Sequence, residues 1–497
     1  MKQIEQNYRS GAMRVIEAPV SRAGPGAAIV RSTVSLISAG TEKQIIDLSR
    51  ASLAGKAIKR PDLVQQTLRK MKTEGIVPVV RKVFAKLDTP IPLGYSLAGE
   101  VVSAGPGSGV QPGDRVACAG AAIANHAEFN AVPKNLMVRI PHGVSDEDAS
   151  FVTLGAIALQ GVRITQPTLG ERVVVMGLGL IGLLTVQILK ANGCRVIGYD
   201  PNPKRVALAK GLGADLVVSD DLTQAVQGFT GGHGADAVVV TASTKSSEPL
   251  NTAAEISRLK GRVVVVGLVG MNIDRDPFYK RELDLRLSMS NGPGRYDPSY
   301  EKEGHDYPLA YVRWTEARNM EAFLELIADG RVTPSRLITH RFRIGQAESA
   351  YALMDGTEPY LAILLDYPDA EPDAAAQRTV AMPARTAPAG DGIAFLGFGN
   401  YAQAVLLPAL PQTARENLST VVTSSGITAH SAAEKGGFAA ASTDAQAVFD
   451  DASISTVFIA TRHDSHADLT LRALEAGKHV FVEKPLALTH DDLDRVI

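Results

Sequence analysis

Cysteine is almost absent from this chain. Cys118 and Cys194 are the only two in 497 residues, which excludes a disulfide framework and a cysteine-rich zinc site. A strong excess of charge is also absent, because 51 Lys and Arg residues oppose 53 Asp and Glu residues and leave a formal net charge of -2. A balance of this kind argues against nucleic acid as the main partner.

Long apolar runs are missing as well. No stretch approaches the ~18 consecutive apolar residues of a membrane span, and residues 1–5 carry no apolar signal region. We therefore expect no membrane partner and a cytoplasmic location. The hydrophobic content of 45% and the charged content of 21% are those of an ordinary globular protein, and the length suggests about three domains.

The most informative feature that is present is a glycine-rich turn between an apolar β-type run and a helical stretch. In such a turn Gly177 permits the tight bend, Gly179 lets the backbone approach a pyrophosphate, and Gly182 lets the helix pack on the strand. The amide groups at the helix start, around Leu180 and Ile181, are placed to meet phosphates. The pattern predicts a dinucleotide-binding site.

The runs around this turn predict its fold. Apolar β-type runs at residues 172–176, 195–199, 237–241 and 262–267 alternate with helical stretches. This pattern predicts an α/β fold with a doubly wound parallel sheet, a Rossmann NAD(P)-binding domain, over residues 151–290.

Asp200 closes the second of these runs. A carboxylate there accepts hydrogen bonds from ribose hydroxyls and repels a 2′-phosphate, which favours NAD over NADP. Lys204 and Arg205 lie close by in the sequence and keep NADP open. Thr241 and Gly267, which end the third and fourth runs, complete the predicted cofactor-binding set.

The sequence before the Rossmann pattern is β-rich. Over residues 1–150 short alternating runs are broken by glycine and proline, and residues 291–366 return to this domain and complete it. A basic, helix-like insertion at residues 49–87 interrupts it. That insertion is either a solvated helical face or a docking surface for an acidic partner.

Several stretches resemble the medium-chain dehydrogenase/reductase superfamily, the alcohol dehydrogenase group, over roughly residues 12–366. They are Ser38-Ala39-Gly40-Thr41-Glu42, Pro92-Leu93-Gly94-Tyr95-Ser96, Val110-Gln111-Pro112-Gly113-Asp114-Arg115-Val116 and Gly211-Leu212-Gly213-Ala214-Asp215. The resemblance implies that the β-rich domain is a GroES-like catalytic domain beside the Rossmann domain.

The departures from that superfamily concern its zinc. Where zinc-dependent members carry catalytic ligands, this chain has Ala39, Tyr95, Ser96 and Gly155, none of which is an imidazole or thiolate, and the four-cysteine structural lobe is missing. We therefore expect no metal and a zinc-independent reaction. Tyr95 is the candidate catalytic residue, because a phenol can donate a proton or a hydrogen bond; the alternative is a tyrosine that only packs. The polar, aromatic residues 290–307 are a candidate substrate lining.

A second glycine turn occurs late in the chain. Residues 367–391, rich in alanine, proline and acidic residues, predict an extended linker. Gly397, Gly399 and Ala402 then repeat the first turn and predict a second Rossmann domain over residues 392–497. The next β-type run ends without a carboxylate, so this site shows no preference for NAD.

The end of the chain resembles the glucose-fructose oxidoreductase / inositol dehydrogenase family. The stretch is Ala476-Gly477-Lys478-His479-Val480-Phe481-Val482-Glu483-Lys484-Pro485. The resemblance implies a catalytic Lys484 that points at the nicotinamide, with Thr461, Glu483 and Pro485 at the cofactor. His466, at a helix start, is either a structural residue or a catalyst, and we expect the structural role. We expect the second domain to be truncated before its substrate domain.

Taken together, the two glycine turns and the two resemblances predict an NAD(P)-dependent dehydrogenase or reductase that needs no zinc. The expected substrate is a sugar or polyol-type small molecule, and the order of the domains resembles bi-domain oxidoreductases of bacterial surface-polysaccharide metabolism. The alternative is a nucleotide-binding scaffold or regulatory protein without turnover. A homo-oligomer is left open.

Overall fold

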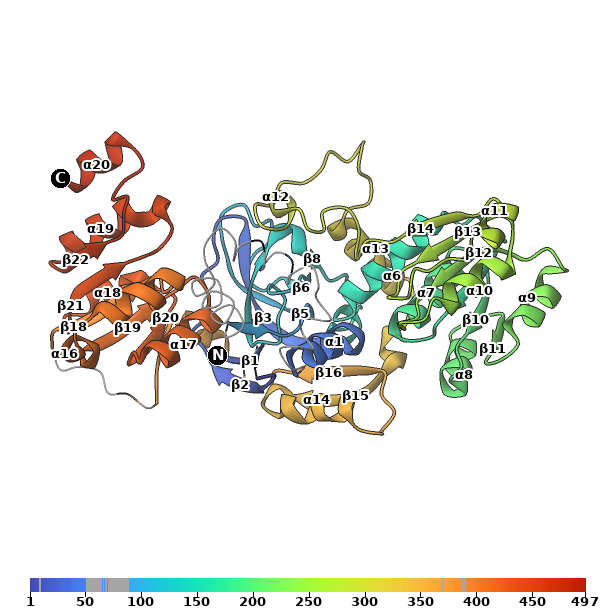
Figure 1. The fold of residues 1–497 in the computed structure, drawn as a ribbon, viewed down its shortest axis with the longest axis horizontal. Coiled ribbons are helices and arrows are strands. Elements are labelled where there is room, and N and C mark those ends of the chain that lie inside the picture. Colours follow the sequence, from blue (N-terminus) through green and yellow to red (C-terminus); the bar gives the residue numbers. More distant parts are fainter. Residues whose placement is uncertain are drawn as a thin grey trace.

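The computed structural model describes residues 1–8, 10–50, 65, 67, 69, 89–368, 370–383, 385 and 390–497. The insertion predicted at residues 49–87 therefore lies almost wholly outside the described residues; residues 49 and 50 end helix α1 (Ala39–Arg50). Figure 1 shows a β-rich unit in the middle, a first α/β unit on the right and a second α/β unit on the left.

The β-rich unit is built around a 7-stranded sheet. Its order is β15-β16-β3-β5-β6-β8, with β7 paired to β3. The strands are β3 (Ala27–Ile37), β5 (Ser96–Ala104), β6 (Arg115–Ala119), β7 (Phe129–Pro133), β8 (Met137–Arg139), β15 (Ile338–Arg343) and β16 (Ala362–Asp366). Strand β16 runs antiparallel to β3 with Ile363 opposite Ile37, so a late segment of the chain completes the early sheet.

A smaller sheet and several short helices cover this unit. The small sheet has the order β2-β1-β4, formed by β1 (Lys2–Asn7), β2 (Met13–Glu17) and β4 (Pro90–Pro92). The helical segments are η1 (Lys134–Leu136), α5 (Asp146–Ala149), α12 (Pro298–Glu301), η2 (Pro334–Leu337), η3 (Ile344–Gln346) and α14 (Ala347–Asp355).

The first α/β unit is a 6-stranded parallel sheet of order β11-β10-β9-β12-β13-β14. Its strands are β9 (Arg172–Met176), β10 (Arg195–Tyr199), β11 (Leu216–Val218), β12 (Ala235–Val240), β13 (Ser257–Val265) and β14 (Asp284–Leu287). Its helices are α7 (Leu180–Ala191), α8 (Pro203–Gly211), α9 (Leu222–Thr230), α10 (Glu248–Ile256) and α11 (Arg275–Lys280). The chain order reverses between β9 and β12, which confirms the predicted doubly wound α/β fold.

Two helices join these units. Helices α6 (Val152–Thr165) and α13 (Glu316–Ala328) lie between the β-rich unit and the first α/β unit (Figure 1). A Cβ atom added at Gly155 of α6 would lie 2.2 Å from the ring of Phe323 of α13, so the missing side chain is what lets the helices approach. Phe151 and Phe323 belong to one buried core with Val173 of β9.

The second α/β unit is a 6-stranded sheet of order β17-β20-β19-β18-β21-β22. Its strands are β17 (Thr379–Ala381), β18 (Gly392–Leu396), β19 (Leu418–Val422), β20 (Ala440–Ser442), β21 (Ile454–Ile459) and β22 (His479–Val482). Its helical segments are η5 (Ala402–Leu406), α15 (Leu407–Ala409), α16 (Gln412–Glu416), α17 (Gly426–Gly436), α18 (Ala445–Asp450), η6 (His463–Ser465), α19 (His466–Glu475) and α20 (His490–Val496). Only β17 runs antiparallel to its neighbour.

The prediction of an extended linker over residues 367–391 is wrong for residues 367–381. Tyr367 is buried in the core of the β-rich unit, η4 (Pro372–Ala376) follows, and β17 is an edge strand of the second sheet. Composition misleads here because an edge strand needs backbone hydrogen bonds and few apolar side chains. In β17 only Val380 is partly buried, and its neighbours Thr379 and Ala381 are exposed.

The second α/β unit packs against the start of the chain. Ile427 of α17 shares a buried cluster with Ile16 and Val20, and the Thr443 hydroxyl donates a 2.5 Å hydrogen bond to the Val20 carbonyl oxygen. A Cβ atom added at Gly426 would lie 2.0 Å from the Pro19 carbonyl oxygen. The absence of a side chain at this residue is therefore a condition of the contact.

Substitution of Gly426 should weaken this contact. We expect Gly426→Ala to lower the free energy of unfolding by about 1–3 kcal/mol, because either the helix or residues 18–20 must shift. Thermal unfolding and limited proteolysis between the units measure the effect. Gly228→Ala in α9 is the matched control, since nothing lies within 4 Å of its added Cβ and alanine favours the helix. Equal stability of the two variants would contradict the prediction.

Candidate active site

A cleft of about 1160 Å³ opens at the carboxyl ends of β9, β10 and β12, where the first α/β unit meets the β-rich unit. The residues predicted for the first site that line it are Tyr95, Gly177, Gly179, Leu180, Ile181, Asp200, Thr241 and Gly267. Gly182 lies behind the wall, under the helix start. The tertiary structure thus brings most of the predicted first site into one cavity.

The glycine turn has the geometry that a phosphate loop needs. Gly177 has a positive φ of 99°, which favours glycine, and a Cβ atom added at Gly182 would lie 1.9 Å from the Gly177 carbonyl oxygen. Around Gly179, in contrast, no atom lies within 4 Å of an added Cβ. Helix α7 begins after Gly179 without a side-chain cap, so its first amides are available to an anion.

Asp200 is buried at the edge of the cleft. Its carboxylate accepts hydrogen bonds from the Leu178 amide at 2.8 Å and the Asn202 amide at 2.9 Å. The Arg205 guanidinium lies 3.5 Å away. Oδ1, which accepts only from the Asn202 amide, keeps a further lone pair for a ribose hydroxyl, while Arg205 offers a positive charge beside Oδ2.

Thr241 and Gly267 follow strands β12 and β13 rather than ending them. The Thr241 hydroxyl donates a 2.6 Å hydrogen bond to the Gly177 carbonyl oxygen, which ties the glycine turn to the neighbouring strand end. A Cβ atom added at Gly267 would lie 2.0 Å from the Ala242 carbonyl oxygen. Both residues shape the turn and the floor beneath it.

Tyr95 lies on the opposite wall of the cleft. Its hydroxyl donates a hydrogen bond to the Ser38 hydroxyl and lies 3.3 Å from the Thr41 hydroxyl. Burial raises the pKa of Tyr95, which keeps the phenol protonated and able to donate. Ser38 and Thr41 are not among the site residues predicted from the sequence, where residues 38–42 serve only to mark the family resemblance. Two hydroxyl side chains at the start of a helix were the available signal.

The other residues that stand where zinc-dependent dehydrogenases carry zinc ligands have structural roles here. Ser96 is fully buried and its hydroxyl donates a 2.6 Å hydrogen bond to the Ser150 carbonyl oxygen, and Gly155 makes room for Phe323. Ala39 offers no ligand atom. The described residues that line the cleft include no histidine and no cysteine.

A buried polar network lies behind this wall. Glu42 accepts hydrogen bonds from the Ser38 amide at 2.8 Å and from the Tyr351 hydroxyl, and it lies 3.2 Å from His126 Nε2. The other ring nitrogen of His126 lies 2.7 Å from the Ser35 hydroxyl. Burial raises the pKa of Tyr351 well above its ordinary value, and the Glu42 charge adds to this. The network holds the helix start that carries Ser38 and Thr41.

The candidate substrate lining at residues 290–307 reaches the cleft only at its beginning. Ser290 and Tyr296 line the cavity, and both have positive φ, at 45° and 68°. A left-handed backbone at two residues that are not glycine stores strain, which is common where side chains are aimed at a ligand. Tyr300 and Tyr307 instead stack on each other, with ring centroids 5.3 Å apart, away from the cavity.

The second glycine turn repeats the geometry of the first. Gly397 has a positive φ of 84°, nothing lies within 4 Å of a Cβ added at Gly399, and Ala402 is buried. The helix after it is short and irregular, because Pro408 and Pro411 interrupt the expected long helix.

Residues of the Glu-Lys-Pro stretch gather at the same end of the second sheet. His466 bridges two backbone carbonyl oxygens, with Nδ1 2.8 Å from that of Pro485 and Nε2 3.3 Å from that of Thr461, which supports its structural role. The Lys484–Pro485 bond is cis, and Lys484 is exposed. A hydrogen bond to Glu483 raises the pKa of Tyr401, so the glycine turn and this stretch are in contact.

The two glycine turns do not share a cavity. Strands β9 and β18, which lead into them, lie in units on opposite sides of the β-rich unit (Figure 1). Tyr95 and Lys484 are therefore not brought together by the fold. Each belongs to its own site.

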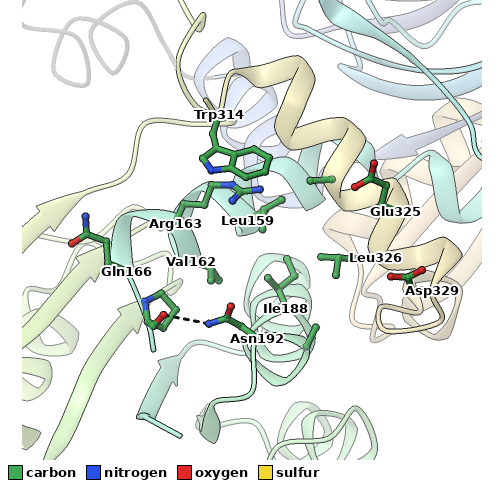
Figure 2. A pocket seen from close by; sticks show the side chains of 13 residues that line it. Leu159, Val162, Arg163, Gln166, Ile188, Asn192, Trp314, Glu325, Leu326 and Asp329 are labelled. Atoms are coloured by element: carbon green, nitrogen blue, oxygen red, sulfur yellow. Dashed lines mark hydrogen bonds between the residues drawn. The ribbon is translucent and has the colours of Figure 1, made fainter. Parts of the chain in front are cut away.

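A further pocket of about 480 Å³ lies between α6, α7 and α13 (Figure 2). The guanidinium carbons of Arg163 and Arg313 lie 3.2 Å and 3.8 Å from the ring centroid of Trp314. Two groups this close to one centroid must take opposite faces, so the indole offers no free face for stacking. Burial, with the Arg313 charge second, lowers the pKa of Arg163 to about 10. This pocket lies apart from the glycine turn.

Comparison with known proteins matches two segments of the chain. Residues 181–302 match the family described as zinc-binding dehydrogenase, and residues 392–497 match the oxidoreductase family with an NAD-binding Rossmann fold. Both matches fall on the α/β units described above. Among the described residues, no helix has the length and apolar character that crossing a bilayer requires.

Similar proteins include several named dehydrogenases. A zinc-type alcohol dehydrogenase-like protein of Escherichia coli is 28% identical over 49% of this chain and 64% of its own length. D-arabitol-phosphate dehydrogenase of Enterococcus avium is 24% identical over 54% of this chain and 80% of its own length. D-guloside 3-dehydrogenase of Escherichia coli is 27% identical over 50% of this chain and 68% of its own length.

The fold is that of solved alcohol dehydrogenases. The alcohol dehydrogenase from Thermus sp. ATN1 superposes with a TM-score of 0.55 at 21% identity, over 74% of this chain and all of that chain. This likeness shows the fold alone. The chain spans 64% of the length of the zinc-type Escherichia coli relative, and so less than two thirds of it.

Glu316, at the start of α13 behind the cleft loop, makes stability depend on pH. Burial, and then the charge of Glu301, raises its pKa to about 8. The folded protein therefore holds a proton that the unfolded chain loses above the ordinary carboxyl pKa. The stability that protonated Glu316 contributes is fully present below the ordinary carboxyl pKa. It is lost as the pH rises to the folded-state pKa of about 8.

We expect the free energy of unfolding to fall between about pH 5 and pH 8, by at most about 1.4 kcal/mol per pH unit from this group. In Glu316→Gln this part of the pH dependence should disappear, whereas Glu325→Gln, on the exposed side of the same helix, should keep it. Denaturant unfolding at several pH values provides the measurement. Parallel pH profiles for all the proteins would show that Glu316 does not titrate in this range.

Proposed function

We propose that the first cleft binds a nicotinamide dinucleotide and catalyses hydride transfer to or from an alcohol carbon of a sugar or polyol-type substrate. The observation that carries this proposal is the shared cavity: the glycine turn, Asp200 and Tyr95 face one space from two structural units. A bound nicotinamide would take up or supply the hydride. The protein holds the dinucleotide by backbone amides and positions the substrate oxygen near Tyr95.

The dinucleotide fits the residues present. An open space at Gly179 and uncapped amides at the start of α7 suit a pyrophosphate. The free lone pair of Asp200 Oδ1 suits a ribose hydroxyl, which favours NAD, although Arg205 lies beside Oδ2.

The reaction proceeds without zinc in this proposal. Ala39, Ser96 and Gly155 supply no ligand atoms to the cleft. During reduction of a carbonyl, the Tyr95 hydroxyl donates its hydrogen bond to the substrate oxygen as negative charge develops there. In the structure this hydrogen is donated to Ser38 and Thr41. When it turns to the substrate oxygen, the Ser38 and Thr41 hydroxyls can rotate and donate to the phenol oxygen, so Tyr95 takes the part that a metal plays in zinc-dependent enzymes.

A polyhydroxyl substrate suits the walls of the cleft. Hydroxyl groups of Ser38, Thr41, Ser290 and Tyr296 line it together with Tyr95, and each can donate and accept hydrogen bonds. Relatives named as D-arabitol-phosphate and D-guloside dehydrogenases support the same substrate class.

The second α/β unit holds a second nicotinamide site in this proposal. Gly397, Gly399 and Ala402 form its phosphate turn, and Thr461, Glu483 and Pro485 surround the cofactor, with Lys484 as the catalytic residue. Linked redox steps on sugars, as in bacterial surface-polysaccharide metabolism, fit two such sites on one chain.

A second candidate is a nucleotide-binding scaffold or regulatory protein without turnover. The observation that favours it is the loss of every ligand residue at the zinc positions of the first cleft. Binding of NAD without any turnover across a panel of sugars, polyols and their phosphates would support this candidate over the enzyme.

Asp200 should set the preference between the two dinucleotides. We expect NAD to bind more tightly than NADP, and Asp200→Asn, which keeps an acceptor for the Leu178 amide, to narrow the difference by about 1–3 kcal/mol. Calorimetric titration with both dinucleotides measures it. Asp220→Asn, an exposed carboxylate of the same cleft, is the control and should change nothing. Equal affinities in the natural protein would remove the role assigned to Asp200.

Tyr95 should be needed for turnover and not for dinucleotide binding. We expect Tyr95→Phe to lower kcat by about 10²-fold or more while the Kd for NAD stays unchanged, because only the hydroxyl is lost. The absorbance of the reduced nicotinamide follows the reaction. Tyr360→Phe, which removes the hydroxyl of another tyrosine that lines the cleft, is the control and should keep full activity. A fully active Tyr95→Phe enzyme would rule out this mechanism.

A further inference from the structure

A cluster of potential metal ligands lies where the second α/β unit meets the β-rich unit. One ligand atom each from Glu5, His430 and Glu434 can be chosen so that all lie within 4.8 Å of one another. Helix α17, which carries His430 and Glu434, packs against the second glycine turn through Ala433, which shares a buried core with Phe398 and Ala402. The functions proposed above make no use of the cluster. It is also unlike the zinc positions of the first cleft, which lack ligand atoms.

The local structure explains how these groups meet. His430 and Glu434 lie one turn apart on α17, so they share a helix face. Glu5 comes from β1, where it pairs with Arg14 of β2. Because the ligands come from opposite ends of the chain, spacing in the sequence gives no sign of them.

Two buried atoms of the cluster have no hydrogen-bond partner among the described residues. They are Glu5 Oε2 and His430 Nδ1. Glu5 is only 4% exposed. Leaving a buried carboxylate oxygen unpaired costs about 1–3 kcal/mol or more. A bound ligand that contacted Glu5 Oε2 and His430 Nδ1 would therefore stabilise the folded protein.

Arg14 occupies only part of the cluster. Its Nε donates a 2.6 Å hydrogen bond to Glu5 Oε1, and its two terminal nitrogens donate to Glu434 Oε1 at 2.9 Å and Oε2 at 2.6 Å. The oxygen of Glu5 that faces away from Arg14, and the imidazole, are left over. Arg14 is half-exposed but is held by these three hydrogen bonds, so a metal that binds Glu434 would have to displace its guanidinium.

The donor set decides what can fill the space. Two carboxylates and one imidazole suit Zn²⁺ and similar divalent transition metals, whereas Mg²⁺ prefers oxygen ligands alone. The open ligand positions would be taken by water.

We propose that Glu5, His430 and Glu434 form a Zn²⁺-type site that clamps the second α/β unit onto the β-rich unit. The metal is structural, because it joins two elements, α17 and β1, that lie far apart in the sequence and belong to different units. The proposal does not depend on the activity of either site.

Metal titration of the full chain tests this site. After dialysis against a chelator, the protein is titrated with Zn²⁺, and in parallel with Mg²⁺, by calorimetry. We expect one Zn²⁺ per chain and no comparable binding of Mg²⁺. His430→Ala should weaken Zn²⁺ binding by about tenfold or more, since even the loss of an outer-shell partner costs that much. His490→Ala, which removes an exposed histidine of the same unit, should bind as the natural protein does.

Arg14→Gln should change the affinity for Zn²⁺ in the opposite direction from His430→Ala. Removal of the competing cation should tighten Zn²⁺ binding, whereas a variant that merely damaged the interface would weaken it. Zn²⁺ should also raise the Tm of the natural protein and of His490→Ala, and not that of His430→Ala. His430 is only partly buried, so its variant should fold even if Glu5→Gln does not.

The outcomes separate clearly. Absence of Zn²⁺ binding, or identical binding by His430→Ala and the natural protein, would overturn the proposal. Zinc that stays stoichiometric in His430→Ala would in addition argue for metal in the first cleft. A loss of oxidoreductase activity with normal Zn²⁺ binding would leave this site intact and count only against the proposed function.

Discussion

The close packing of α6 against α13 is the contact on which the cleft depends. The two walls of the cleft belong to different units, and the ring of Phe323 against Gly155 lies in the core that joins them. Even a methyl group at residue 155 would meet that ring. Because interiors are packed to near-crystalline density, this contact sets the distance between Tyr95 on one wall and the glycine turn on the other.

A buried carboxylate holds the other wall of the cleft in place. Glu42 gathers the Ser38 amide, the Tyr351 hydroxyl and His126, and so holds the helix start that presents Ser38 and Thr41 to Tyr95. A buried charge is tolerable only with several partners of this kind. These partners hold the helix start beside the cleft, so Ser38 and Thr41 keep their positions next to Tyr95.

The two glycine turns show the same local physics in different surroundings. In both, a glycine with positive φ starts the turn and a second glycine leaves open space for a phosphate. The first is followed by a regular helix and an acid at the next strand end, while prolines shorten the helix after the second. The second unit also packs against residues 18–20, where Gly426 lies against Pro19.

The amino-acid sequence by itself determined the parallel sheets, both glycine turns and the place of Asp200, because each rests on neighbouring residues and their periodicity. It misled at residues 367–381, where an edge strand forms with little apolar content. Only the tertiary structure decided that Tyr95 meets Ser38 and Thr41, that Glu42 has partners from two distant segments, and that Glu5 lies beside His430. Such contacts follow from how units pack across long stretches of chain, and no local pattern of residues records that packing.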